Sequence, residues 1–340
     1  MSNKEIKEQL VGLYFPVLDG NGFVALTDTM GDDKAIENAA RTSYTNNTRK
    51  VSDTRALLRR LFRDRHDSPF EFAELQFHVR APLYVIQQWL RHRTNSFCQE
   101  SFRYSEVKTD FETTLENGWR LQSKTNKQGS ENVLTEWPKQ YSEEFENLTL
   151  QSFNAPTFES GPGAWLSYRQ QGLHNQMQEV YEERLKLGIA REQARVDIPV
   201  CTYSTLCIKT DLRNLLHFLQ LRLASDAQKE IREYANVIAG IVKLLFPIVW
   251  EAFVDYSFCS SRLSRLDLDF LEVLNYYNGS WDDKRKQFEQ DGLVEERSKL
   301  KGQEYESFWE KVKGKKPPVF ELDLSQGQRK LDSVEEGKNE

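Results

Sequence analysis

Cysteine is scarce in this sequence, and no hydrophobic run is long enough to span a membrane. The 340 residues include four cysteines, which form no C-x-x-C pair and no cluster with histidine, so neither a disulfide framework nor a metal site is expected. The most apolar stretch, 238–254, is interrupted by Lys243, Pro247 and Glu251 too early for a bilayer crossing. The start of the chain has no apolar run of the kind found in a signal peptide. The sequence therefore predicts a protein of the reducing cytoplasm with no membrane partner.

A basic excess is also absent. Lys and Arg number 46 against 52 Asp and Glu, a net charge of −6, whereas a general nucleic-acid binder carries a surplus of positive charge. This balance is still compatible with a local basic pocket for one small anion. Aromatic residues, in contrast, are plentiful: the chain has 20 Phe, 13 Tyr and 7 Trp. A chain this aromatic can bury a sizeable core, which excludes wholesale disorder.

Hydrophobic periodicity predicts short strands and several helices. Residues 74–80 alternate apolar and polar side chains, which indicates a half-buried strand, and a second strand is expected at 22–26. Pro82 begins a helix that reaches about residue 91. Further helices are predicted at 35–40, 52–61, 133–145, 176–187, 210–246, 263–274 and 305–312.

The densest chemical signal lies at residues 91–104, directly after the predicted helix. The segment contains three arginines, one histidine and three serine or threonine hydroxyls. Arginine forks bind phosphate oxygens two at a time, and hydroxyls with free backbone N–H groups complete such a pocket. Gln88 and Arg91 are three residues apart and share a helix face. On spacing alone, an arginine-rich solvated surface is an equally good interpretation.

This segment closely resembles the signature of the flavin-dependent thymidylate synthases, in which R-H-R is followed after seven residues by S and then by R-Y. The matching residues are Arg91, His92, Arg93, Ser101, Arg103 and Tyr104. Further blocks similar to the family follow one another in order at 50–55, 65–71, 77–82, 119–130, 194–199 and 212–222. The likeness covers roughly residues 20–255, far more than a chance motif match would.

The resemblance implies a reductive methylation. In this family dUMP receives a methylene group from methylenetetrahydrofolate, NADPH supplies reducing power through FAD, and the product is dTMP. No cysteine nucleophile is used. The family is typically a homotetramer with active sites at subunit interfaces.

The resemblance also assigns candidate site residues. The flavin set consists of His66, Ser68, Arg91, His92, Arg93, Gln99, Asp211, Arg213 and His217. The dUMP set consists of Gln88, Arg91, Gln99, Ser101, Phe102, Arg103, Arg195 and Arg222. Ser101 and Arg222 are the candidate catalytic residues, because Arg222 resembles the arginine that polarises the uracil ring, as electrostatic stabilisation would require.

Three positions depart from the family pattern. Cys98 and Gln99 stand where the family usually has Asn-Glu, and Asp211 stands where it often has Asn. We interpret Cys98 as a small half-buried residue rather than a nucleophile. Asp211 is interpreted as a helix N-cap that could still touch the cofactor.

The spacing within 212–222 has a geometric consequence. Arg213 and His217 are four residues apart and share a helix face, whereas Arg213 and Arg222 are nine apart and point to opposite sides. A straight helix cannot direct both arginines into one compact pocket. Either the helix bends or its two faces serve different pockets, which fits a homo-oligomer.

These observations predict an α+β fold, a mixed sheet flanked by long helices. The catalytic domain is expected at 1–258 with an insertion at about 135–180, followed by a helical extension at 259–326 and a disordered tail at 327–340. Two alternatives remain. The first is a related flavin and folate enzyme that methylates or hydroxymethylates another pyrimidine nucleotide. The second is an inactive homologue whose tail recruits a partner.

Overall fold

The protein forms two compact units. The computed structural model describes residues 3–42, 53–108, 110–124, 127–151, 154–292, 298–317 and 319–329. The first unit consists of Met1–Asn47, Asp67–Leu245 and Phe320–Glu340, and the second of Thr48–His66 and Phe246–Val319. The division falls at Leu245/Phe246, where Pro247 begins a new helix, and the predicted boundary near residue 258 lies within the second unit.

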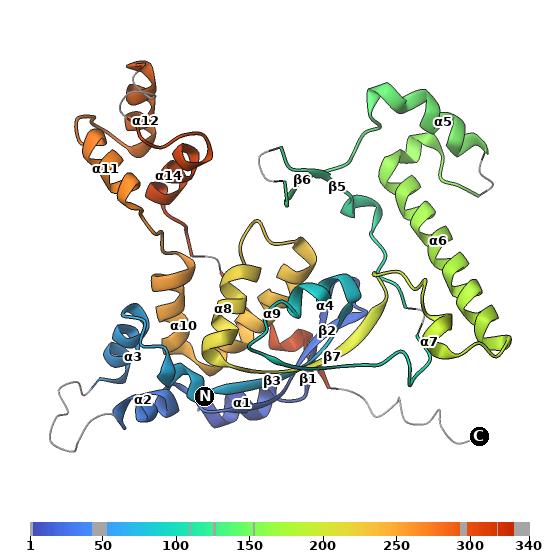
Figure 1. Ribbon diagram of the computed structural model, residues 1–340, viewed down its shortest axis with the longest axis horizontal. Helices are drawn as coiled ribbons and strands as arrows, with labels where there is room; N and C mark the ends of the chain where they lie inside the picture. Colours follow the sequence, from blue (N-terminus) through green and yellow to red (C-terminus); the bar gives the residue numbers. More distant parts are fainter. Residues whose placement is uncertain are drawn as a thin grey trace. The chain divides into compact units, whose positions relative to one another are not determined.

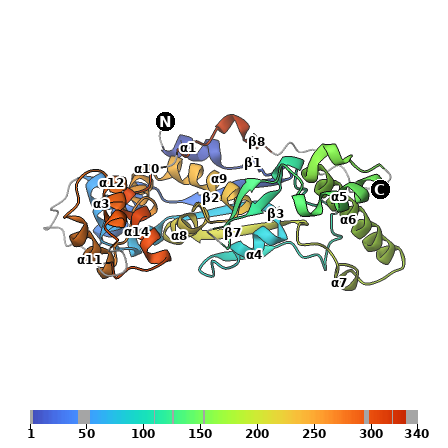
Figure 2. The same ribbon diagram turned by 90° about the horizontal axis from the view of Figure 1, so that it is seen from above.

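The first unit is built on a six-stranded sheet in the order β4-β7-β3-β2-β1-β8. Its strands are β1 Leu13–Val17, β2 Gly22–Met30, β3 Glu74–Pro82, β4 Ser96–Gln99, β7 Tyr203–Asp211 and β8 Gln328–Arg329. The central strands β3 and β7 run side by side in both views (Figures 1 and 2).

Every pairing in this sheet is antiparallel, so the prediction of a mixed sheet is wrong. The connections explain this result. After β2 ends at Met30, the chain returns to begin β3 at Glu74 directly opposite, and after β3 ends at Pro82 it returns to Tyr203 opposite that end. A connection that starts and ends at the same edge of a sheet makes neighbouring strands antiparallel.

Helices cover one face of this sheet. The helices of the first unit are α1 Asn3–Leu10, α2 Asp33–Arg41, α4 Leu83–Trp89, α5 Ser142–Gln151, α6 Gly161–Lys186, α7 Arg191–Ala194, α8 Leu212–Arg222 and α9 Lys229–Leu245. Helices α4 and α9 contact strands of this sheet, and α8 contacts β7 (Figure 1). Leu75, Phe77 and Val79 of β3 are buried. Polar side chains such as His78 and Arg80 alternate with them, as expected for an antiparallel sheet with one open face.

The second unit is helical. It contains α3 Thr54–Arg63, α10 Pro247–Phe253 with a π-helical turn at Val254–Phe258, α11 Arg265–Leu274, α12 Trp281–Gln290 and α14 Gln303–Lys313. Arg59 of α3 binds Glu251 at 2.8 Å and Asp255 at 2.7 Å, which joins α3 to α10.

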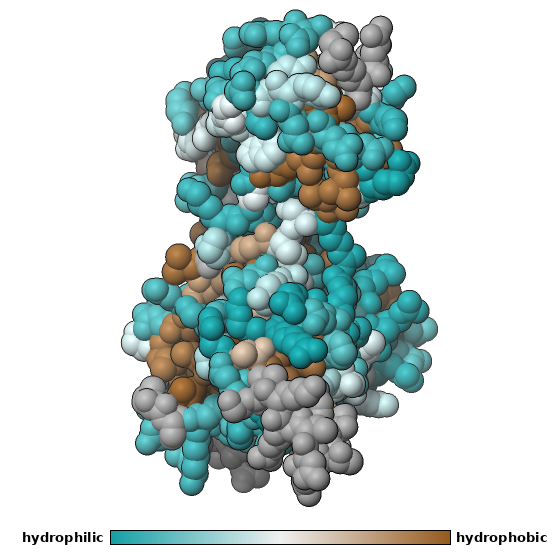
Figure 3. Space-filling model, turned by 90° about the vertical axis from the view of Figure 1, so that its left-hand side faces the viewer, coloured by the Kyte–Doolittle hydropathy of each residue, from teal (hydrophilic) through white to brown (hydrophobic). Residues whose placement is uncertain are grey.

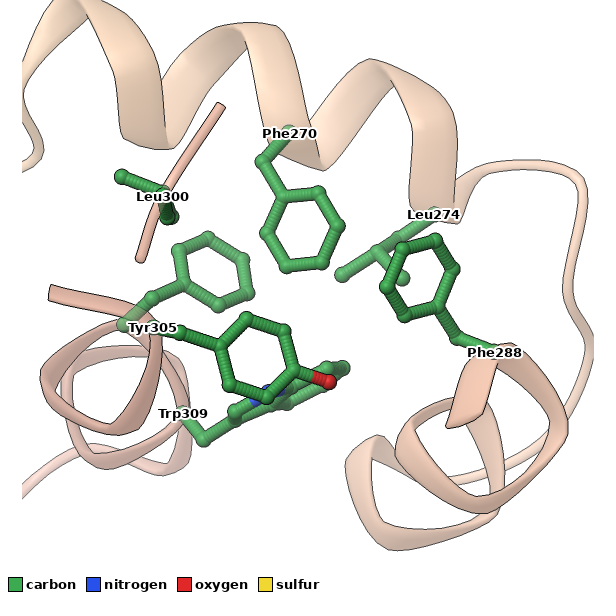
Figure 4. Packing of buried hydrophobic residues seen from close by; sticks show 7 residues of the cluster. Phe270, Leu274, Phe288, Leu300, Tyr305 and Trp309 are labelled. Atoms are coloured by element: carbon green, nitrogen blue, oxygen red, sulfur yellow. The ribbon is translucent and has the colours of Figure 1, made fainter. Parts of the chain in front are cut away.

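An aromatic core holds α11, α12 and α14 together. Phe270, Phe288, Tyr305 and Trp309 converge from the three helices (Figure 4), and the Phe270 and Phe308 rings are 4.8 Å apart. Hydrophilic residues cover most of the face shown in Figure 3. The amphipathic patterns at 263–274 and 305–312 therefore reflect a packed core.

Several of the helices and strands predicted from hydrophobic periodicity are present in the structure. The strands at 22–26 and 74–80 are confirmed, as are the helices at 35–40, 263–274 and 305–312. The predicted helix at 133–145 is wrong, because residue 133 ends strand β6 (Ser130–Val133) and Pro138 has an extended backbone before α5. The pattern at 210–246 is two helices, and the expected disorder from residue 327 is contradicted at β8, which pairs with β1. Residues 330–340 lie outside the described residues.

Candidate active site

Aromatic packing between α4 and α8 fixes the start of the signature segment. Trp89, at the end of α4, stacks on Phe218 of α8 with ring centres 4.9 Å apart and an interplanar angle of 13°. The rings of Trp89 and Tyr234 of α9 also form a T-shaped, edge-to-face pair. Such ring pairs stabilise packing beyond the area that they bury. The chain therefore enters residues 91–104 from a rigid support.

Arg222 lies at the centre of the candidate site. Its Nε donates a hydrogen bond to His92 Nε2 at 3.2 Å, and its Nη2 donates to the Gln88 carbonyl oxygen at 3.1 Å. Three of the residues predicted from the sequence thus meet in one hydrogen-bonded group. Both acceptors are uncharged when His92 is neutral, so these contacts leave the positive charge of the guanidinium uncompensated.

His92 is held in its neutral form. Burial, together with the positive charge of Arg222 and the neighbouring His217, lowers the pKa of His92 from 6.5 to about 4. The imidazole is 8% exposed, and its ring centre lies 6.1 Å from that of His217. A neutral imidazole can accept the hydrogen bond of Arg222 through one ring nitrogen.

Acidification is expected to destabilise the protein through His92. In the unfolded chain this imidazole has its ordinary pKa near 6.5, against about 4 in the folded state, so between these values the unfolded state binds more protons. The free energy of unfolding should therefore fall by up to about 1.4 kcal/mol per pH unit as pH drops from 6.5 towards 4, and this loss should stop below 4. Urea unfolding across this range should show a shallower pH slope in His92→Gln than in the natural protein, and equal slopes would contradict the assignment.

A second group of predicted residues gathers around α7. Phe102 is buried with Val107, Tyr181 and Ala194. Arg103 forms an exposed ion pair with Glu192 of α7 at 3.4 Å, and its backbone N–H donates to Ser101 Oγ at 3.3 Å. Arg195, half-buried, follows α7 directly.

The N-terminus of α8 forms a third group. Asp211 caps this helix as predicted: its side chain accepts hydrogen bonds from the Asn214 backbone N–H at 2.8 Å and from Asn214 Nδ2 at 2.6 Å. Arg213 pairs with Asp67 at 3.3 Å. Arg213 and Arg222 therefore contact different elements of the first unit.

The remaining candidates are exposed. Arg91, Arg93 and His217 are exposed in the first unit, as is Ser68. Gln99 is also exposed and makes a long hydrogen bond to Ser204 at 3.4 Å. His66 is exposed too, but it belongs to the second unit.

A cavity of about 630 Å³ lies beside β1, β2, β3 and β7. Its walls include Tyr14, Phe23, Arg80, Lys108 and Tyr203. Of the residues predicted from the sequence, Phe102 alone is among its lining residues. A cavity of this size is typical of small-molecule binding sites. The other candidate residues, however, do not line it.

The family follows from the match of the whole catalytic region. The family model described as "Thymidylate synthase complementing protein" matches residues 25–248. A flavin-dependent thymidylate synthase of Thermus thermophilus is 42% identical over 262 residues, covering 77% of this chain and 86% of that protein. The chain belongs to the flavin-dependent thymidylate synthase family.

Other members of the family and a solved structure agree. A flavin-dependent thymidylate synthase of Dictyostelium discoideum is 37% identical over 261 residues, covering 74% of this chain and 78% of that protein. The crystal structure of a UMP/dUMP methylase, PolB from Streptomyces cacaoi, bound with 5-Br UMP, has a TM-score of 0.56 and 31% identity. It covers 71% of this chain and 97% of that chain.

Two features of this member of the family were not predicted from the sequence. Asn95, inside the signature, is buried and accepts a hydrogen bond from Thr210 at 2.7 Å, which anchors the segment to β7. The position of Asn95 inside the 91–104 segment was the one feature of the sequence that could have indicated this role. His174 contacts the Cys201 sulfur at 3.3 Å, but burial raises the pKa of Cys201 to about 11 and lowers that of His174. Both groups are then neutral, unlike an activated nucleophile and base.

The prediction that Cys98 is half-buried is wrong, because this residue is exposed on β4. Within the described residues, no cluster of three His, Cys, Asp or Glu side chains could hold a metal ion. No described helix combines the length and the apolar character needed to cross a membrane.

Proposed function

We propose that the protein converts dUMP to dTMP by reductive methylation, with FAD as its flavin, methylenetetrahydrofolate as the carbon donor and NADPH as the reductant. The hydrogen-bonded group of Arg222, His92 and Gln88 carries this proposal, because it joins three residues that match the family's site. The similarity to enzymes named flavin-dependent thymidylate synthase and UMP/dUMP methylase supports the reaction class.

The donor groups present fit a flavin dinucleotide. Arg91, Arg93 and Arg213 are exposed cations that would bind the pyrophosphate, and His217 would lie beside them. The side-chain nitrogen of Asn95 is buried without a hydrogen-bond partner, which leaves one donor to satisfy close to the start of α8. When bound, the flavin supplies the reducing electrons of the reaction.

Arg222 is suited to stabilise an anion on the uracil ring. A guanidinium has five N–H donors, and the contacts to His92 and Gln88 use two of them. The remaining donors could bind a uracil oxygen while the positive charge favours the imide anion. That interaction would raise the electron density at the ring carbon that accepts the methylene group.

The residues around α7 would hold the phosphate of dUMP. Ser101 offers a hydroxyl, and Arg103 and Arg195 offer guanidinium forks. The Arg103–Glu192 pair is exposed, and exposed pairs are worth about 0–1 kcal/mol, so a phosphate could displace the carboxylate at little cost.

The purified full-length protein provides the direct test. We expect flavin absorbance bands, and formation of dTMP from dUMP when labelled methylenetetrahydrofolate and NADPH are added. A colourless protein that FAD cannot reconstitute would contradict the proposal. Bound FAD without turnover on any pyrimidine nucleotide would instead favour an inactive homologue.

UMP is a second candidate substrate. The similar solved structure is named a UMP/dUMP methylase and contains 5-Br UMP, and Gln99 in this chain departs from the family's usual carboxylate. Parallel assays with UMP and dUMP at equal concentration would decide between them. Faster methylation of UMP would replace dUMP as the proposed substrate.

Gln99→Glu is expected to change dUMP affinity by tenfold or less. The amide oxygen of Gln99 can accept the same hydrogen bond as a carboxylate, so the natural residue lacks only the charge, worth about 1 kcal/mol. Ser204 can donate to the new carboxylate, so the fold should tolerate the change. Binding and turnover of dUMP, UMP, dCMP and dTMP would be measured for both forms. If only the variant used dUMP, the natural site would be tuned for another nucleotide.

We also propose that the active sites form between subunits of a homotetramer. The opposite orientation of Arg213 and Arg222 on α8 supports this idea, because one helix can then serve two sites. Light scattering after gel filtration should give four times the 39.8 kDa mass of the chain. A monomer with full activity would contradict the proposal.

A further inference from the structure

Two exposed cysteines face each other across the edge of the sheet. Cys98 of β4 and Cys207 of β7 are direct partners in the antiparallel register, and both side chains are exposed. Residues directly opposite each other in antiparallel strands project to the same face. The two thiols therefore lie side by side on the open face, and Cys98 belongs to the signature segment.

Further contacts fix the strand register that places Cys98 and Cys207 opposite each other. The ladder continues beyond Gln99, where the Glu100 backbone N–H donates to the Thr205 carbonyl oxygen at 3.0 Å. The carboxylate of Glu100 also accepts a hydrogen bond from the Thr205 hydroxyl at 3.1 Å. These contacts hold β4 against β7 and keep Cys98 and Cys207 opposite each other.

The backbone spacing suits a disulfide. Hydrogen-bonded pairs alternate along an antiparallel ladder, so the Glu100–Thr205 bond makes Cys98–Cys207, two residues away on each strand, a hydrogen-bonded pair as well. The Cα atoms of such a pair are about 5.5 Å apart, inside the range of roughly 4.4–6.8 Å found in disulfides. The Cβ atoms of a hydrogen-bonded pair are about 5.5 Å apart and those of a disulfide roughly 3.5–4.5 Å, so a small local movement of edge strand β4 accompanies bond formation.

We propose that Cys98 and Cys207 form a reversible disulfide that locks the signature strand β4 to β7, with a small disulfide such as oxidised glutathione as the oxidant. One cysteine thiolate attacks the glutathione disulfide, forms a mixed disulfide and releases one glutathione. The other then attacks the protein-bound sulfur, forms the Cys98–Cys207 bond and releases the second glutathione. The protein loses two electrons, the oxidant gains them, and each thiol proton ends on a released glutathione.

The other two cysteines are placed differently and serve as controls. Cys201 is half-buried against His174, and Cys259 belongs to the second unit. Trypsin releases Cys98 in peptide 94–103 but leaves Cys201 and Cys207 together in peptide 196–209. The experiment is therefore best performed on the full chain carrying Cys201→Ser, so that a cross-link to 196–209 can involve Cys207 alone.

Incubation of folded Cys201→Ser protein with oxidised glutathione should join peptides 94–103 and 196–209, and dithiothreitol should separate them. Adding Cys98→Ser or Cys207→Ser should abolish the link and leave the remaining cysteine as a glutathione adduct, whereas adding Cys259→Ser should leave the link intact. Separate glutathione adducts on both cysteines, a link to Cys259, or a covalent dimer would overturn the proposal, as would two thiols that stay reduced.

Discussion

Arg222→Ala is expected to abolish dTMP formation while the flavin stays bound. The guanidinium is the charged member of the group that includes His92 and Gln88. Removal of one stabilising donor from an active site typically lowers kcat by about 10²–10³-fold, and here the charge is lost as well. Arg222→Lys should restore little, because lysine is a point charge that cannot make two directed hydrogen bonds from a planar fork.

Arg232→Ala is the matched control for this prediction. Arg232 lies on the next helix, α9, and makes a hydrogen bond to the Ser225 carbonyl oxygen at 3.1 Å. We expect this variant to keep near-normal turnover. Flavin absorbance and a thermal melt of each variant would separate a lost chemical group from a lost fold. Near-normal turnover of Arg222→Ala would show that the residue does not act on the uracil ring.

Phe270→Ala is expected to destabilise the second unit by about 3–5 kcal/mol, as is typical when a buried Phe is truncated. Phe270 is 2% exposed, and its ring centre lies 5.0 Å from that of Phe288 and 4.8 Å from that of Phe308 (Figure 4). Denaturant unfolding followed by tryptophan fluorescence would detect the change, since Trp309 belongs to the same cluster.

Leu268→Ala provides the control on the same helix. Leu268 is 51% exposed, so its truncation should change the free energy of unfolding by no more than about 0.5 kcal/mol. We expect both variants to form dTMP at conditions where they remain folded, because α11, α12 and α14 follow residues 25–248, which the family model matches. Loss of turnover in folded Phe270→Ala protein would assign this core a role in catalysis.

The sequence determined the features that depend on near neighbours. The alternation in 74–80 predicts β3 because each side chain needs only its neighbours to select a face. Asp211 caps α8 because its carboxylate reaches a backbone N–H three residues away. The signature in 91–104 is also a local feature, because the residue types of one short segment are sufficient to indicate the family.

Only the tertiary structure decided which distant residues meet. Arg222 and His92 are 130 residues apart in the chain, and their contact exists because Trp89 and Phe218 pack α4 against α8. The opposition of Cys98 and Cys207 depends on the register between β4 and β7, and a slip of one residue would place one thiol on the other face. Gln328–Arg329 belong to the first unit because β8 pairs with the edge of β1. Local patterns carry no information on such pairings, because the free energy that selects them arises only when distant segments bury their surfaces together.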